Sequence, residues 1–260
     1  MPEPGVILSL EGRVAVVTGG SRGIGAAVVR MFVKSGARVL FNFQKAKEEA
    51  ARLAEECGGP LRCIAVQQDL ATVDAARNLI DTAVAQFGRV DIIVANHGVW
   101  PPQDVPIDRM TSEQWRTTLA VNLDSVFGLV KFGIAQMKKQ GGAGHVVLVS
   151  STAGQRGEAF HCDYAASKGA LISMVKGLST ELAAHGIYVN CVAPGWVDTD
   201  MAAPALQDPE VSRRVYNAIP LGRVGKPEEI AATVLFLCTP HAGFITGEIV
   251  NVNGGAVLVG

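Results

Sequence analysis

Charged side chains are scarce in this chain of 260 residues. Asp, Glu, Lys and Arg make up 18% of it, against roughly 25% in an average soluble domain, and 48% of the residues are apolar. A chain of this composition can bury a large core, and it can also cover part of its outer surface in an oligomer. The formal net charge of −1 provides no bulk attraction to nucleic acid or to an anionic membrane. We therefore expect neither as a partner.

The sequence also lacks the patterns of a disulfide framework or a metal site. Its five cysteines are scattered, odd in number and without a CxxC pair (Cys57, Cys63, Cys162, Cys191 and Cys238). Its five histidines show no HExxH or similar ligand spacing. These absences favour reduced thiols in a cytoplasmic protein without a bound metal.

Signals for secretion or membrane insertion are missing as well. The first five residues lack the basic and then apolar character of a signal peptide. No apolar run reaches the roughly 20 residues that span a bilayer. We therefore expect a protein that does not enter a membrane.

What the chain does have is a regular alternation of strand-like and helix-like segments. Apolar runs predict strands at 13–18, 37–43, 61–66, 91–95, 145–149, 187–192 and 248–252. Helical periodicity predicts helices at 24–36, 45–57, 72–87, 164–184 and 229–237, and a long one from Thr111 through Ile134. The segment 198–226, rich in Ala and Pro, is expected to be a mobile excursion. The alternation predicts an α/β fold, in which residues 1–260 form a single domain with a doubly wound parallel sheet (Rossmann fold) and helices on both faces.

A glycine-rich turn joins the first strand to the first helix. The segment 19–25, GGSRGIG, contains four glycines directly after the strand. Glycine permits the tight turn and lets the backbone approach a pyrophosphate, while the helix N-terminus presents free N–H groups and a partial positive charge. In this strand–loop–helix context the motif predicts dinucleotide binding.

The stretch from His145 to Lys168 contains candidates for acid–base chemistry. It begins as a strand, continues through Ser150 and Ser151, and enters a helix in which Tyr164 precedes Lys168 by four residues. Positions i and i+4 share a helix face, so the phenol and the ammonium can converge on one point. Beside a strand that ends in hydroxyls, such a pair can exchange a proton with an oxygen.

Polar clusters follow the expected strands at their carboxyl ends. They are the segment 19–25, Asp69, the segment 96–98, Ser150 with Ser151, and Pro194 with Gly195. In a doubly wound sheet the ligand binds at these ends, near the point where the strand order reverses. One site at this edge is therefore expected to contain all of them.

Motifs from Gly12 to Gly255 resemble those of the short-chain dehydrogenase/reductase family. They are TGGSRGIG at 18–25, NHG at 96–98, VNLDSVF at 121–127, Ser151, Tyr164 with Lys168, PGWVDT at 194–199, ITG at 245–247 and VNGG at 252–255. The segment 220–231, PLGRVGKPEEIA, resembles the C-terminal part of 3-oxoacyl-carrier-protein reductases.

The resemblance implies a catalytic tetrad of Asn122, Ser151, Tyr164 and Lys168. Tyr164 would be the general acid or base, with its pKa lowered from roughly 10 by Lys168 and a cationic nicotinamide. Lys168 would also hydrogen-bond the nicotinamide ribose, and Ser151 would polarise the carbonyl. Asn122 would kink its helix and hold a water that relays protons to Lys168. Ser150 is the alternative pocket serine, although the spacing to Tyr164 favours Ser151.

The resemblance also implies a set of cofactor contacts. They are Gly19, Ser21, Arg22, Gly23, Ile24, Gly25, Lys45, Asp69, Asn96, Gly98, Tyr164, Lys168, Pro194, Gly195, Val197 and Thr199. Asp69 would contact the adenine, or alternatively cap the helix after it. His97 stands where the family has a small residue; we leave it out of the catalytic set, as a tolerated surface or sheet-edge residue is an equally good interpretation.

The end of the second strand indicates the cofactor preference. An NAD enzyme of this type has an acid there, whereas this chain reads NFQK at 42–45 and its next acid is Glu48. Arg22 and Lys45 could both pair with a 2′-phosphate dianion. We therefore expect NADP(H), with NAD(H) as the alternative; Arg22 could instead be a solvated loop cation.

The substrate is encoded less clearly. The segment 198–226 is expected to close over it as a lid, and the apolar residues of that segment favour a ketone with a hydrophobic body. Reduction of a 3-oxoacyl thioester is the leading hypothesis, and a sugar, a steroid or a small secondary alcohol is the alternative. An acyl carrier protein would need a basic patch, for which Lys138, Lys139, Arg213 and Arg214 are candidates. A non-catalytic nucleotide sensor is disfavoured because all four tetrad positions are filled.

Several other side chains are expected near the substrate, and one surface is expected in an oligomer. His161, Cys162 and Asp163 are interpreted as pocket lining, and Gln155, Phe160 and His161 as carriers of specificity. Trp100, Trp196 and Met201 are interpreted as packing residues that can also touch substrate. The apolar run at 256–259 favours burial between subunits, and a homotetramer is expected, as in most members of the family.

Overall fold

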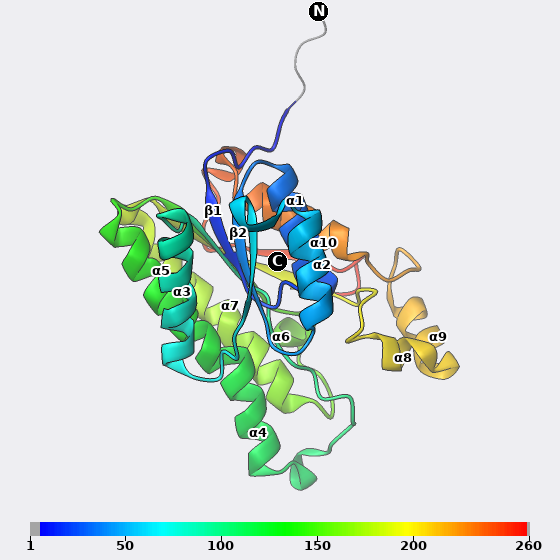
Figure 1. The fold of residues 1–260 in the computed structure, drawn as a ribbon. Helices are drawn as coiled ribbons and strands as arrows, with labels where there is room; N and C mark the ends of the chain where they lie inside the picture. Colours follow the sequence, from blue (N-terminus) through cyan, green and yellow to red (C-terminus); the bar gives the residue numbers. More distant parts are fainter. Residues whose placement is uncertain (1–5, 259–260) are drawn as a thin grey trace, which may run out of the picture.

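The apolar runs of the sequence form one sheet of seven parallel strands (Figure 1). The computed structural model describes residues 6–258. The strand order across the sheet is β3-β2-β1-β4-β5-β6-β7, which reverses direction between β1 and β4. The strands are β1 Val14–Val17, β2 Arg38–Phe43, β3 Cys63–Gln67, β4 Ile92–Ala95, β5 Gly144–Val149, β6 Ile187–Pro194 and β7 Ile249–Val252. Each predicted strand is present, and the doubly wound parallel sheet is confirmed.

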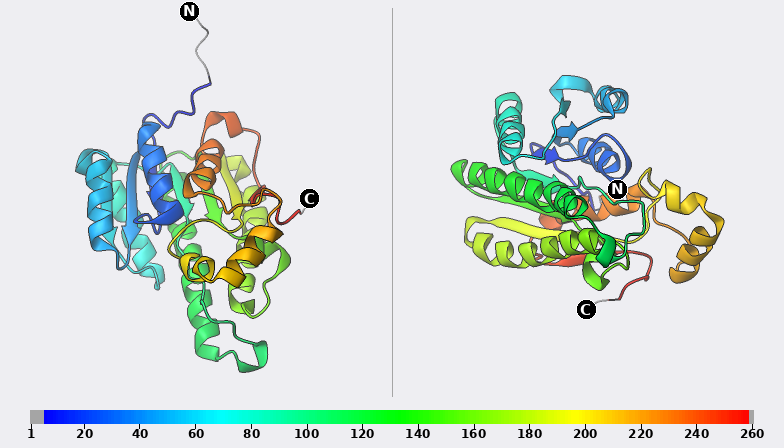
Figure 2. Two further views of the ribbon diagram at one scale, coloured as in Figure 1. Left: turned by 90° about the vertical axis from the view of Figure 1, so that its right-hand side faces the viewer. Right: turned by 90° about the horizontal axis from the view of Figure 1, so that it is seen from below.

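Helices cover both faces of this sheet (Figures 1 and 2). On one face lie α1 Gly23–Lys34, α2 Lys47–Glu56 and α10 Pro227–Leu237. On the other lie α3 Val73–Phe87, α5 Ser125–Lys139 and α7 Cys162–Leu182. Because both faces are covered, the central strands are apolar on both sides, which explains why they read as continuous apolar runs.

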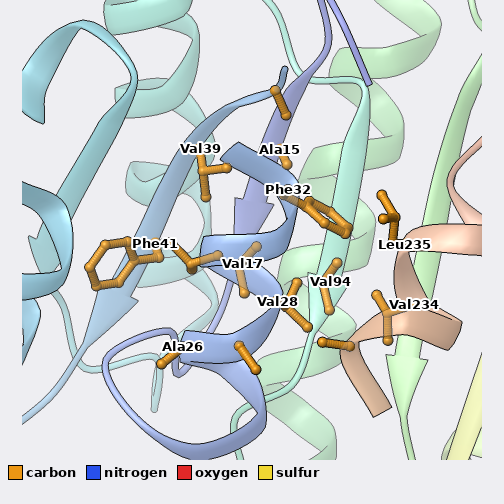
Figure 3. Close-up of a cluster of buried hydrophobic side chains, with 14 of the residues drawn as sticks. Ala15, Val17, Ala26, Val28, Phe32, Val39, Phe41, Val94, Val234 and Leu235 are labelled. Carbon is orange, nitrogen blue, oxygen red and sulfur yellow. The ribbon is translucent and has the colours of Figure 1, made fainter. Parts of the chain in front are cut away.

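Strand β1 shows how one short segment supports two cores. Ala15 and Val17 face α1 and α10, whereas Val14 and Val16 face the opposite helices, and all four are fully buried. Figure 3 shows the first of these cores, in which Phe32 of α1 lies beside the sheet and close to α10. The alternation fixes the register of β1, because a slip by one residue would exchange its two faces.

The long helix predicted from Thr111 is interrupted by a π-helical turn. Thr111 caps α4 Ser112–Leu119 by accepting a hydrogen bond from the backbone N–H of Gln114 at 3.1 Å. The π-helical turn Ala120–Asp124 follows and leads directly into α5. Such insertions are frequent at functional sites, and this one contains Asn122.

The same stretch is the one candidate membrane span among the described residues. By length and composition alone, the region Ser112–Lys139 is long and apolar enough to cross a membrane. No such run was expected from the sequence. Half of its apolar window is buried inside the fold. Its apolar side chains pack against the sheet and α3 as part of the core, which accounts for its apolar composition.

Within residues 6–258, three α-helices occupy segments for which no helix was predicted. The short helix α6 Thr152–Arg156 follows β5, and α8 Ala203–Gln207 and α9 Pro209–Ala218 lie within the segment 198–226. The pair α8 and α9 stands apart from the helices that cover the sheet (Figure 2). The cap of α9 was readable in the sequence: Asp208 accepts hydrogen bonds from the backbone N–H groups of Glu210 and Val211, and proline follows it at the first helical position.

Candidate active site

A cavity of about 740 Å³ lies at the carboxyl ends of the strands, where the strand order reverses. Its lining includes nearly all the residues predicted to bind a cofactor or to act in catalysis. Those that line it are Gly19, Ser21, Arg22, Gly23, Ile24, Lys45, Asp69, Asn96, Gly98, Ser151, Tyr164, Lys168, Pro194, Gly195, Val197 and Thr199. Gly25 and Asn122 lie behind this wall within the described part of the chain, so any contribution they make passes through their neighbours.

Two glycines of the loop after β1 are required by sterics. A Cβ atom on Gly25 would collide with the backbone oxygen of Gly19, and one on Gly20 would come within 2.5 Å of the Phe41 side chain. The turn therefore closes over β2 and against the start of α1 only without side chains there. The backbone of the loop is left facing the cavity, as a pyrophosphate site needs.

Asn42 holds this loop from the neighbouring strand, a role that the sequence did not reveal. Its Oδ1 accepts a hydrogen bond from the N–H of Gly19 at 2.9 Å, and its Nδ2 donates to the carbonyl of Gln68 at 2.9 Å. Its backbone carbonyl accepts from the N–H of Gly20 at 3.0 Å. The Asn42 side chain is buried, and buried polar groups are hydrogen-bonded. A polar residue at the end of an apolar strand is therefore the feature of the sequence that could have indicated this role.

Asp69 is not the cap of the helix after it, and its contact with adenine stays a prediction. It lines the cavity, and its Oδ1 accepts from the backbone N–H of Ala71 at 3.0 Å in the turn before α3, whose own cap is Thr72. Its Oδ2 accepts from Nε2 of Gln44 at 2.8 Å. Near Lys45 the cavity also contains an acid that was not predicted there, since Glu49 rather than Glu48 lines it.

Arg22 makes an ion pair across the mouth of the cavity. Its Nη1 lies 3.4 Å from Oδ2 of Asp200, and both side chains are more than two-thirds exposed. Exposed pairs of this kind contribute little to stability. The interpretation of Arg22 as a simple solvated cation is therefore incomplete, because it connects the glycine loop to the segment after β6.

The turn after β4 is fastened to β1. Asn96 donates from Nδ2 to the carbonyls of Thr18 and Gly19, at 3.0 and 3.2 Å. Gly98 follows, where an added Cβ would lie 3.2 Å from Oδ1 of Asn122 and 3.3 Å from Nζ of Lys168. The absence of a side chain at Gly98 lets the lysine approach this backbone.

His97 is a bridging residue within the site, not a surface residue. Its Nδ1 lies 2.7 Å from Oγ1 of Thr18, and its Nε2 lies 2.6 Å from Oγ of Ser125. Ser125 donates its own proton to the carbonyl of Val121 at 2.6 Å, so Nε2 donates to Ser125. In a neutral ring Nδ1 is then an acceptor facing the hydroxyl of Thr18, which also lies 3.3 Å from the carbonyl of Val94. Burial, with a smaller contribution from the charge of Lys168, lowers the pKa of His97 to about 4. The imidazole is therefore neutral near pH 7.

Asn122 is fully buried in the π-helical turn and holds the backbone after β4. Its Oδ1 accepts from the N–H of Val99 at 2.8 Å, and its Nδ2 donates to the carbonyl of Val99 at 2.9 Å and to Oγ of Ser167 at 3.1 Å. Its side-chain amide thus joins the turn after β4 to helix α7. The water relay implied by the resemblance stays a prediction.

The two serines after β5 have different surroundings. Ser150 is buried and donates to the backbone carbonyl of Lys168 at 2.8 Å. Ser151 accepts from the N–H of Ala153 at 3.1 Å and hydrogen-bonds the Tyr164 side chain. The geometry agrees with the choice of Ser151 as the residue beside the phenol.

Tyr164 is held protonated by its surroundings. Burial raises the pKa of its phenol to about 12, the hydrogen bond with Ser151 opposes this change, and the charge of Glu158 adds to it. The expected lowering by Lys168 is not present in the protein alone. Nζ of Lys168 lies 5.9 Å from the centre of the phenol ring and donates to the carbonyl of Val149 at 2.8 Å. Burial lowers the pKa of Lys168 to about 8.

The residues expected to contact substrate between β5 and α7 are not the ones that line the cavity. Gln155, Phe160 and His161 do not line the main cavity among the described residues, and neither do Cys162 and Asp163. Gln155 donates to Oδ1 of Asn251 at 2.6 Å, and Asp163 accepts from Thr118 on α4 at 2.7 Å.

Arg156 and Glu158 face the cavity from that segment instead. Trp100, Trp196 and Met201 also line it, which supports the interpretation that they can touch substrate. Trp100 stacks on His161 with ring centres 4.8 Å apart and meets Trp196 edge-on at 6.1 Å. Aromatic rings and the charged side chains of Arg156 and Glu158 therefore line the same cavity.

The chain matches one protein family over most of its length. The family model described as enoyl-(acyl carrier protein) reductase matches residues 19–257. A 3-oxoacyl-[acyl-carrier-protein] reductase of Synechocystis is 37% identical over 252 residues, which are 96% of this chain and 99% of the relative. This chain belongs to the short-chain dehydrogenase/reductase family.

Other relatives within this family bear different names. An acetoacetyl-CoA reductase of Rhizobium meliloti is 37% identical over 94% of this chain and 98% of the relative. A glucose/ribitol dehydrogenase structure from Brucella melitensis has a TM-score of 0.88 at 34% identity, covering 96% of this chain and 98% of that chain. A 7α-hydroxysteroid dehydrogenase structure, described as complexed with NADH and 7-oxo glycochenodeoxycholic acid, has a TM-score of 0.89 at 31% identity over 96% of each chain. The protein is therefore an oxidoreductase of carbonyl or CH–OH groups that uses a nicotinamide cofactor.

Proposed function

We propose that this short-chain dehydrogenase/reductase uses NADPH to reduce the ketone of a 3-oxoacyl thioester. The observation that carries the proposal is the placing of Tyr164, Ser151 and Lys168 at one part of a cavity whose other part contains the glycine loop. The names of the Synechocystis and Rhizobium relatives favour a thioester substrate.

The cavity suits a nicotinamide dinucleotide on its own geometry. The glycine loop exposes its backbone where side chains would collide, and Gly98 leaves Lys168 open to a neighbouring group. The loop would hold the pyrophosphate, Asp69 and Lys45 would lie beside the adenosine, and Lys168 and Asn96 would lie near the nicotinamide ribose. When bound, the cofactor supplies a hydride to the carbonyl carbon.

The chain's own part in the reaction is to bind the ketone oxygen and give it a proton. Negative charge develops on that oxygen as the carbonyl is reduced, so a donor positioned there stabilises the transition state. Tyr164 is protonated near neutral pH and can donate, while Ser151 offers a second hydrogen bond to the same oxygen. Lys168, with a pKa of about 8, is close enough to neutrality to pass on a replacement proton.

Preference for NADPH is supported by the cations at the adenosine side. Arg22 and Lys45 both line the cavity, and charge-assisted bonds to a phosphate dianion are strong. Glu49 also lines this side, and its neighbour Arg52 lies 3.8 Å from its Oε1, so part of its charge is offset. The balance favours a 2′-phosphate.

A carrier protein as substrate donor has partial support. Of the candidate basic residues, Lys138 and Lys139 are at the C-terminal end of α5, at the opposite edge of the sheet from the cavity. Arg213 and Arg214 are exposed on α9, after the segment that lines the cavity mouth. The four cations therefore do not make one patch, and α9 is the surface that a carrier would meet.

We also propose a homotetramer in the cytoplasm. Trp115 and Phe127 are 37% and 49% exposed on α4 and α5, and Phe244 and Leu258 near the C-terminus are 104% and 88% exposed. Exposed apolar side chains on two surfaces are typical of an assembly with more than one interface. Residue 259, part of the predicted apolar tail, lies outside the described residues. Five free cysteines support a reducing compartment.

The decisive experiment is steady-state reduction of a series of 3-oxoacyl thioesters, as coenzyme A and carrier-protein conjugates, with NADPH and NADH. We expect the highest kcat/KM with a thioester and NADPH. A higher kcat/KM for a steroid or sugar ketone would favour the alternative substrates. Cofactor binding without turnover of any carbonyl compound would favour the nucleotide sensor.

A further inference from the structure

Glu158 places an acid at the substrate part of the cavity, a position that no sequence motif indicates. It follows α6 and precedes α7, and it lines the same cavity as Tyr164 and Ser151. It also lines a second hollow of about 340 Å³, whose other walls are mainly apolar and include Val105, Ile107 and Phe160. The side chain is only partly exposed and so forms a wall between the two spaces.

The carboxylate is held in place by an aromatic neighbour. The indole of Trp100 hydrogen-bonds it, and Trp100 is itself fixed by stacking on His161. His161 is fixed in turn, because its Nε2 lies 2.9 Å from the carbonyl oxygen of Pro101. A carboxylate with such support cannot easily turn away from a bound substrate.

The charge of Glu158 is felt at the reacting position. Its charge contributes to the raised pKa of the Tyr164 phenol. Arg156 lines the same cavity and offsets part of this charge, since it lowers the pKa of the Glu158 carboxyl, but burial of that carboxyl is the larger effect and raises its pKa. The phenol marks where the ketone oxygen would bind, so a group attached next to that ketone would share the cavity with the Glu158 carboxylate.

We infer that Glu158 is a specificity-determining residue, which favours a hydroxyl or protonated amine beside the reacting carbonyl and disfavours a carboxylate there. A hydroxyl or ammonium can donate a hydrogen bond to Glu158, whereas a second carboxylate is repelled in this partly desolvated site. The inference rests on the proposed function and deepens it. A 3-oxoacyl thioester has no charge next to its ketone, so the site would accept the thioester and reject the free 3-oxo acid left by its hydrolysis.

Three ketones of similar size test the inference: 4-hydroxy-2-butanone, 2-pentanone and acetoacetate, each reduced with NADPH. For the wild-type protein we expect kcat/KM to fall in that order. In Glu158→Gln, the ratio of kcat/KM for the hydroxy ketone to that for acetoacetate should fall about tenfold, equivalent to the loss of one modest charge interaction. Glu158→Asp keeps the charge, so its ratio of kcat/KM for the hydroxy ketone to that for acetoacetate should stay close to the wild-type ratio.

Glu181→Gln is the matched control, because Glu181 is exposed near the end of α7 that is remote from the cavity. It should keep the wild-type ratio. If Glu158→Gln is insoluble, Glu158→Ala provides the same comparison. The inference is overturned if wild type takes acetoacetate as well as the hydroxy ketone, or if neutralising Glu158 leaves the ratio unchanged. Failure of wild type to reduce any ketone would instead overturn the proposed function, and the inference with it.

Discussion

Nζ of Lys168 donates a hydrogen bond to the backbone carbonyl of Val149 at 2.8 Å, so the last residue of β5 fixes the lysine of the predicted tetrad. The side chain is 4% exposed, and this burial is the cause of its lowered pKa of about 8. The lysine is therefore positioned by the strand that precedes Ser151, as well as by its own helix. This arrangement has a measurable effect on stability.

Replacing Lys168 with methionine should flatten the pH dependence of stability above neutrality. The folded pKa of Lys168, about 8, lies below its ordinary value of 10.5, so the unfolded chain binds more protons between these values. The free energy of unfolding of wild type should therefore rise with pH in this window, by about 2–3 kcal/mol between pH 8 and 10 from this group. Urea unfolding at both pH values checks this. An equal rise in Lys168→Met would contradict the assignment.

His97 should make the protein less stable in mild acid. Its folded pKa of about 4 is below the ordinary 6.5, so the unfolded chain binds the extra proton between pH 6.5 and 4, and stability is lost as the pH falls through that range. His97→Asn should show a smaller loss. His145 has a similarly lowered pKa, caused mainly by burial, so His97→Asn with His145→Asn should reduce the loss further. Identical acid profiles for wild type and His97→Asn would show that burial does not keep the His97 imidazole neutral in the folded protein.

Arg22→Ala and Lys45→Ala should each weaken NADPH binding without an equal effect on NADH. Loss of one charge-assisted contact to the 2′-phosphate should raise the KM for NADPH by about tenfold. The matched control is Lys47→Ala, because Lys47 is exposed at the start of α2 and outside the cavity lining. The cofactor assignment fails if wild type prefers NADH, or if all three variants behave alike.

Gly25→Ala should disrupt the dinucleotide loop. Its new methyl group would collide with the backbone oxygen of Gly19, so we expect both a lower melting temperature and loss of cofactor binding. Gly177→Ala is the control: that position lies within α7 and has no atom within 4 Å of an added Cβ. It should stabilise the protein by about 0.5–1 kcal/mol, because alanine is the better helix former. Tight cofactor binding by Gly25→Ala would show that the loop can relax.

Patterns of local origin predicted most of the fold. The seven strands and the helices that cover the sheet follow from apolar periodicity, and the position of the site follows from parallel strands ending at one edge. Helix α8 was missed because it has only five residues, too few to show a helical period. Helix α9 was missed because it is polar with few apolar repeats, although Asp208 and Pro209 form a recognisable start. The π-helical turn at Asn122 could not be predicted from hydrophobic periodicity, because one inserted residue shifts the helical register without changing the composition.

The sequence predicted which residues lie at the candidate site better than it predicted which partners those residues contact. Motif spacing distinguishes Ser151 from Ser150, and the structure turns only Ser151 toward Tyr164. The roles of Asn42 and His97 depend on which residues of other strands and helices they meet, and a single sequence does not contain that information. Glu158 was missed for the same reason: its neighbours in sequence, Gln155 and His161, were equally polar, and only the fold decides which of them faces the cavity.

Tyr164→Phe provides the most direct test of the central claim, that Tyr164 donates the proton to the ketone oxygen. The substitution removes the hydroxyl and keeps the ring, so cofactor binding, followed by quenching of tryptophan fluorescence, should stay within about twofold of wild type. With acetoacetyl coenzyme A and NADPH, kcat should fall by about 10²–10⁴-fold, the range that positioned general acids contribute. Full turnover by Tyr164→Phe with unchanged kcat would contradict the account.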